Sequence, residues 1–173
     1  GTKVVTFEIG RDISEVVEVV GLGENHLYTG KAVEPKVGKV TLGAGGMVLT
    51  KDVDYTLSYA NNVNVGTATI TVTGTGIYRG SRSFEFQIIR RSVAQCQANM
   101  TAKVTYDGKN QTPAVTVKYG DISLKNGTDY SVTYLNNEKP GTARVIINGR
   151  GNYTGNKVLN FDISVNPMSG VKG

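Results

Sequence analysis

The chain of 173 residues contains a single cysteine, Cys96, and no tryptophan. One cysteine cannot form a disulfide within the chain, so packed apolar faces must hold the fold together. No apolar run approaches the roughly 18 residues that a membrane-spanning helix requires. We therefore expect no membrane insertion in this fragment.

Leucine and proline are also scarce, with eight and four residues, whereas valine, isoleucine and threonine account for 52. Side chains branched at Cβ lose rotamer freedom in helices and pack well on pleated surfaces, so the composition predicts an all-β fold. The 22 glycines and 14 asparagines suit the many turns of such a fold. A helical bundle or a Rossmann-type enzyme is disfavoured.

The charge is mild, with a net value of +5. Four basic residues lie near the middle of the chain, namely Arg79, Arg82, Arg90 and Arg91. No aromatic or glycine-rich nucleic-acid motif accompanies them, and a charge cluster is most often a solvated face. We expect no nucleic-acid binding.

The sequence contains a tandem repeat. Residues 54–80 align without gaps on residues 129–155, and 12 of the 27 aligned positions are identical. Upstream, a Tyr-x-Gly-Lys pattern followed by a proline recurs at a spacing of 78 instead of 75: Tyr28, Gly30, Lys31 and Pro35 match Tyr106, Gly108, Lys109 and Pro113. The first copy therefore has three additional residues. We place them in the glycine-rich stretch 43–46, because a turn tolerates insertion at little entropic cost.

Residues 3–9 resemble a third, partial copy. Val5, Phe7 and Ile9 repeat the alternation of Phe84, Phe86 and Ile88. We interpret residues 1–9 as the last strand of an upstream repeat or as an extra edge strand of the first domain, although one β alternation can match another by chance. The repeat then predicts domains at 10–90 and 91–166, a short linker at 90–92 and a tail at 167–173.

Each full copy shows the period-two alternation of half-buried strands. Apolar and polar residues alternate over 55–59, over 68–73 and over 84–88, and again at the matching positions of the second copy. Strands with one packed face and one solvent-exposed face are typical of two stacked sheets. Six or seven such strands in about 75 residues predict an immunoglobulin-like β-sandwich, so the chain is expected to be two of them in tandem.

Catalytic and metal sites find little support. The one histidine, His26, has Val104 as its counterpart in the second copy, and a strand or turn position is its simpler interpretation. Asp54 and Asp129 occupy equivalent positions, but each copy offers one such acid where glycoside hydrolysis needs two, so we expect them to cap backbone amides. No acidic loop suits calcium and no Cys/His spacing suits zinc. We expect no enzyme, cofactor or metal.

The candidate binding residues are Tyr78 and Tyr153, which lie in matching Gly-x-Tyr-x-Gly turns. Small neighbours could leave these rings exposed for stacking on a sugar or a peptide. In the alternative interpretation, which we favour, each ring folds over the edge of the sandwich as a plug, in the manner of a tyrosine corner.

The segments YTGKAVEP, DVDYTLSYANNVNVGTATITVTGTGIYRG and NGTDYSVTYLNNEKPGTARVIINGRGNYTG resemble the immunoglobulin-like repeats of large surface proteins from Gram-positive (Firmicutes) gut bacteria. The resemblance covers roughly residues 22–165 and brings no catalytic residues. It implies a secreted or wall-attached protein in which such repeats act as stalks or adhesive modules. The second copy departs from the pattern at Glu138-Lys139-Pro140, where the first has Val63-Asn64-Val65.

These observations lead us to expect a non-catalytic extracellular surface module, either a spacer or an adhesion-type pair of repeats. Its expected partners are neighbouring repeats of the same chain and an unidentified glycan or protein of the host or cell wall. The alternative, which depends on Tyr78 and Tyr153, is a carbohydrate-binding accessory module of a secreted glycoside hydrolase.

Overall fold

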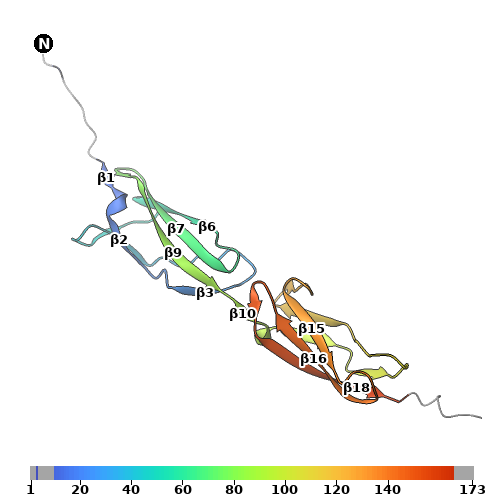
Figure 1. The fold of residues 1–173 in the computed structure, drawn as a ribbon. Coiled ribbons are helices and arrows are strands. Elements are labelled where there is room, and N and C mark those ends of the chain that lie inside the picture. The colour runs from blue at the N-terminus through green and yellow to red at the C-terminus, as the bar shows by residue number, and fades with distance from the viewer. Residues whose placement is uncertain (1–2, 4–9, 166–173) are drawn as a thin grey trace, which may run out of the picture. The chain divides into compact units, whose positions relative to one another are not determined.

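The structure is a computed structural model that describes Lys3 and residues 10–165. The chain divides into two compact units, Gly1–Ile89 and Arg90–Gly173. In the described residues both units consist of β-strands and one three-residue 3-10 helix each (Figure 1), which confirms the all-β fold expected from composition. Apart from Lys3, the strand expected within residues 1–9 lies outside the described residues, as does the expected tail at 167–173.

Unit 1 contains a three-stranded sheet and a four-stranded sheet. The three-stranded sheet is antiparallel and has the order β2 (Val16–Val20), β4 (Lys39–Leu42), β5 (Met47–Leu49). The four-stranded sheet has the order β3 (Asn25–Leu27), β9 (Ser81–Ile89), β7 (Gly66–Gly74), β6 (Tyr55–Ala60). Within it β3 is parallel to β9, and the other pairs are antiparallel.

A short parallel ladder precedes these sheets in unit 1. Strand β1 (Arg11–Asp12) pairs with β8 (Tyr78–Arg79), so the entering segment lies beside the turn that leads into β9. The 3-10 helix η1 (Ile13–Glu15) then connects β1 to β2. Asp12 caps this helix, since its carboxylate accepts a hydrogen bond of 2.8 Å from the backbone N–H of Ser14.

Unit 2 repeats the arrangement strand for strand. Its three-stranded sheet has the order β11 (Gln97–Met100), β13 (Val115–Tyr119), β14 (Ile122–Ser123). Its four-stranded sheet has the order β12 (Lys103–Thr105), β18 (Asn156–Ser164), β16 (Gly141–Gly149), β15 (Tyr130–Leu135). The entering strand β10 (Arg91–Ser92) is parallel to β17 (Tyr153–Thr154), and η2 (Val93–Gln95) follows it.

The core of unit 1 lies between its two sheets. Val16, Val40 and Leu49 from the three-stranded sheet pack in one cluster with Tyr55 and Val72 from the four-stranded sheet. Two sheets that share a core in this way form a sandwich-like unit.

The alternation over 68–73 is confirmed: Ala68, Ile70 and Val72 are fully buried, as are their counterparts Ala143, Val145 and Ile147. In the last strands Phe86 and Ile88 are buried, and so are Phe161 and Ile163. Phe84 and Leu159, which were expected to be buried with them, are half-buried. At Phe84 the Arg82 guanidinium lies 5.4 Å from the ring centroid, so one side of this ring supports a cation–π contact at the surface.

Candidate functional site

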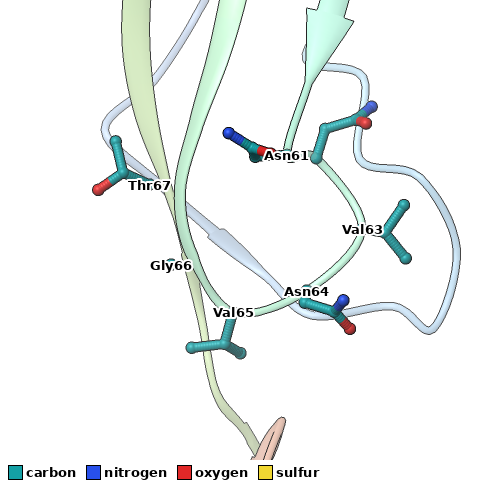
Figure 2. A pocket seen from close by; sticks show the side chains of 7 residues that line it. Asn61, Val63, Asn64, Val65, Gly66 and Thr67 are labelled. Carbon is teal, nitrogen blue, oxygen red and sulfur yellow. The ribbon is translucent and has the colours of Figure 1, made fainter.

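The loop between β6 and β7 begins with an Asn-Asn pair that recurs in the matching loop of unit 2, whereas Glu138-Lys139-Pro140 replaces Val63-Asn64-Val65 at its tip. Figure 2 shows the loop of unit 1 with Val63, Asn64 and Val65 at its tip. Asn61 has a positive φ of 55°, and Asn136, the first asparagine of the matching loop, has 57°. Asparagine tolerates this left-handed conformation better than most residues, so the first asparagine of each pair suits the turn.

The second asparagine of each pair anchors a distant segment. The Asn62 carbonyl accepts a hydrogen bond of 2.7 Å from the Val33 N–H, and the Asn62 side chain donates one of 3.1 Å to the Val33 carbonyl. Asn137 bonds to Gln111 in the same way: its carbonyl accepts from the Gln111 N–H at 2.8 Å, and its side chain donates to the Gln111 carbonyl at 2.9 Å. Each asparagine therefore satisfies both backbone groups of one residue in the segment before β4 or β13.

A shared tyrosine fixes the same segment two residues further along. The Tyr59 hydroxyl donates to the Pro35 carbonyl at 3.1 Å, and Tyr134 donates to Pro113 at 2.6 Å. Burial raises the pKa of both phenols. The shared Tyr, Asn and Pro positions thus form one structural network, and this network was missed by sequence reasoning because its members lie 24 and 21 residues apart.

A shallow hollow of about 250 Å³ follows the loop of unit 1 and is lined by residues 61–67. The lining consists of amide, hydroxyl and aliphatic groups and contains no titratable side chain. At the tip of the matching loop of unit 2, charged residues and proline replace Val63, Asn64 and Val65. The hollow offers no acid, base or nucleophile, and its lining is not shared by the two units.

The two candidate tyrosines are buried. Tyr78 is 7% exposed and Tyr153 is 2% exposed. Each lies in a two-residue strand that pairs with the entering segment of its own unit, Tyr78 opposite Arg11 and Tyr153 opposite Arg91. In this structure neither ring offers a face for stacking on a sugar or a peptide, whereas a ring that covers the edge of the core agrees with the favoured interpretation.

The repeated aspartates cap backbone amides, as expected. One carboxylate oxygen of Asp54 accepts a hydrogen bond of 2.8 Å from the Thr50 N–H, and Asp129 accepts one of 2.8 Å from Lys125. In both units the aspartate N–H also donates to the carbonyl of that same residue. Each carboxylate therefore closes the turn that precedes β6 or β15.

His26 and Cys96 have separate structural roles. His26 lies in β3, where its Nε2 is 2.7 Å from the Leu22 carbonyl and its ring contacts Phe86 edge-on. Cys96 is 2% exposed, and burial raises the pKa of its thiol, although Lys157 and Arg91 partly oppose this shift. A buried neutral thiol is a poor nucleophile, in agreement with the interpretation of Cys96 as a small hydrophobe.

The four central arginines divide between the units. Arg79 and Arg82 belong to unit 1, whereas Arg90 and Arg91 belong to unit 2. Arg82 donates to the Ser14 carbonyl at 3.1 Å, and the Arg91 guanidinium lies 4.1 Å from the centroid of the Tyr119 ring. Arg82 and Arg91 thus have structural contacts within their own units.

Among residues 10–165 and Lys3, no group of three or more His, Cys, Asp or Glu side chains could hold a metal ion. Within the same residues no helix is long and apolar enough to cross a membrane. Comparison of the chain with family models, with curated proteins and with solved structures found no match.

Proposed function

We propose that this chain is a non-catalytic module of an extracellular bacterial surface protein, and that its two units are immunoglobulin-like domains that act in tandem as a spacer. One observation carries the proposal: each of the twelve residues shared by the aligned 27-residue segments has an identifiable role in the fold. In unit 1 these are Asp54, Tyr55, Tyr59, Asn61, Asn62, Gly66, Thr67, Ala68, Gly74, Gly76, Tyr78 and Gly80.

Most of the shared residues shape turns. The roles of Asp54, Tyr59, Asn61 and Asn62 are the cap, the anchors and the left-handed turn described above. Three of the four shared glycines have a positive φ in both units. The fourth, Gly74, has no room for a side chain, because a Cβ there would lie 2.8 Å from a backbone atom of Tyr78.

The remaining shared residues fill the core or join strands. Tyr55, Ala68 and Tyr78 are buried, as are their counterparts in unit 2. The Thr67 hydroxyl accepts a hydrogen bond from the Gln87 side chain at 2.9 Å. Its counterpart, Thr142, donates to Asp162 at 3.1 Å, so both join β7 or β16 to the last strand.

Within the aligned segments 54–80 and 129–155, no shared side chain is left for a ligand site that both units would have in common. A binding or catalytic module that is duplicated keeps the residues that contact its ligand, whereas a spacer needs only its core and its turns. The pairing of a three-stranded with a four-stranded sheet supports the immunoglobulin-like assignment, which rests also on the resemblance of the repeated segments. The surface location rests on that resemblance alone.

Labelling of intact cells tests the proposal. Antibodies raised against the 173-residue chain are expected to label intact cells of the bacterium that produces it, and protease treatment of those cells should remove the label. An antibody against a cytoplasmic enzyme serves as the control for lysis. Labelling that requires lysis would overturn the surface location.

Affinity electrophoresis in gels that contain cell-wall or plant polysaccharides tests the spacer role against the carbohydrate-binding alternative. We expect the same mobility as in gels without polysaccharide, with serum albumin as the reference. Specific retardation would overturn the spacer role and favour a carbohydrate-binding accessory module.

A further inference from the structure

The chain enters and leaves each unit at opposite ends of the unit's last strand. In unit 1 the entering strand β1 pairs with β8, and β9 begins at Ser81, only two residues after Arg79 at the end of β8. Strand β9 then runs for nine residues to Ile89, about 27 Å at the usual rise per residue. Figure 1 shows β1 at one end of unit 1 and β3, the partner of residues 87–89, at the other.

A pull on the two ends of unit 1 therefore acts along β9. This strand has eight register pairs with β7 and three with β3. Hydrogen bonds of an antiparallel ladder are perpendicular to the strands, so a force along the strand loads them together instead of one after another. Unit 2 has the same geometry, with eight pairs between β18 and β16 and three between β18 and β12.

A basic side chain also ties the first segment of each unit to its last strand. In unit 1 Arg82, the second residue of β9, donates to the carbonyl of Ser14 in η1 at 3.1 Å. In unit 2 the equivalent Lys157 donates to the carbonyls of Ala94 at 3.3 Å and Cys96 at 2.6 Å. Although the side chain differs between the units, the connection is the same, which points to a requirement for the connection itself.

We propose that each unit is a tension-bearing element that resists extension between its entry and exit points by shear of its last strand. This inference deepens the proposed spacer function and rests on it only for the biological setting of the force. The resistance itself is a property of the fold and is measurable on the isolated chain.

Single-molecule force spectroscopy on the full chain tests the inference by comparing two directions of pull on unit 1. The shear direction uses a handle at the N-terminus and one at Arg90→Cys. The unzipping direction uses handles at Val63→Cys and Arg90→Cys, because Gly66, which follows the loop that holds Val63, pairs with Ile88 near the end of β9. Cys96→Ala in both proteins leaves the introduced cysteines as the only thiols, and both proteins are pulled at one loading rate.

We expect the unfolding force of unit 1 to be at least about twofold higher in the shear direction, because the barrier to forced unfolding depends on how many bonds break together. Equal forces in the two directions would overturn the inference. The surface location would be unaffected, since it is tested separately by cell labelling.

Variants of the tie give a second measurement. Arg82→Ala is expected to lower the unfolding force in the shear direction and to leave the unzipping force unchanged. Lys36→Ala, at an exposed lysine of the loop before β4, is the matched control and should change neither force. An Arg82→Ala protein with an unchanged shear force would contradict the role of the tie.

Discussion

In the β6–β7 loop and in the matching β15–β16 loop, the two neighbouring asparagines have different structural roles. The first takes up a backbone conformation with positive φ. The second is buried or half-buried and uses its side-chain amide to satisfy a carbonyl of a segment that lies 29 residues away in unit 1 and 26 in unit 2. Only the second asparagine joins parts of the unit that are distant in sequence.

Loss of this second amide should destabilise unit 2. Asn137→Ala removes the donor for the Gln111 carbonyl at a site that is 8% exposed. We expect the free energy of unfolding to fall by about 1–3 kcal/mol, the usual cost of an unsatisfied buried acceptor. Urea denaturation followed by circular dichroism measures the change. Asn156→Ala, at an exposed position of β18, is the control, and an equal loss in both variants would contradict the anchoring role.

Buried phenols make the stability of both units sensitive to alkaline pH. Burial raises the pKa of Tyr55, Tyr59, Tyr130 and Tyr134 above the usual value of 10.0. A group whose pKa is higher in the folded chain than in the unfolded one stabilises the fold fully below the unfolded value, and this contribution is lost as the pH rises through the folded value.

We therefore expect the urea midpoint to decline steeply once the pH exceeds about 10, from the reference pKa of tyrosine. Denaturation curves at several pH values, with phenolate absorbance recorded in parallel, check this expectation. Tyr134→Phe should start from a lower midpoint, because it loses the hydrogen bond to Pro113, and should show a shallower alkaline decline. A decline as steep as that of the parent chain would show that Tyr134 does not contribute.

At the scale of strands and turns, the tight connection between β7 and β9 depends on Gly74, although the φ of this glycine is not positive. A Cβ on Gly74 would lie 2.8 Å from the Tyr78 carbonyl carbon and 2.9 Å from the Arg79 nitrogen. Both are backbone atoms, so the clash cannot be relieved by rotating a side chain.

Gly74→Ala should accordingly destabilise unit 1 by about 2 kcal/mol or more, a cost comparable to overpacking in a core. Gly45→Ala is the matched control, because a Cβ on Gly45 meets nothing within 4 Å and that residue has no positive φ. Thermal denaturation of both variants measures the difference. Similar melting temperatures for the two would contradict the steric explanation.

The predictability of the elements follows from how local their signals are. Strands β6, β7 and β9 were predicted because alternation over five or six residues in each of them is visible in the chain itself. Strand β3, with three residues, was not, since its partner lies 62 residues further along. The helices η1 and η2 were not predicted either. Their N-caps, Asp12 and Ser92, are each followed by a β-branched residue and lie 80 residues apart, and this repeated pattern is a signal for both helices.

The candidate site shows the same division. The capping role of Asp54 and Asp129 could be predicted because the bond spans four residues. The exposure of Tyr78 could not be predicted, because a tyrosine between glycines fits an exposed turn and a buried edge equally well. The answer depends on β1, which comes 67 residues earlier and pairs with this turn.

For the whole molecule, we expect each unit to be stabilised by its own hydrophobic core. Phe86 is 2% exposed within a cluster that includes Val33, Ala68, Ile70 and Ile88, all from unit 1. Phe86→Ala should cost unit 1 about 3–5 kcal/mol. In differential scanning calorimetry we expect this variant to lower one of two transitions and to leave the other in place. A shift of both transitions by the same amount would show that the units unfold as one.

In unit 1 the last strand to be synthesised, β9, lies in the interior of its sheet, between β3 and β7. A ribosome must therefore complete residue 89 before the larger sheet of unit 1 can close. Until then, β3 and β7 lack the neighbour that both require, and pairing over so long a sequence separation forms slowly. In each unit the larger sheet is thus completed only after nearly the whole unit has been synthesised.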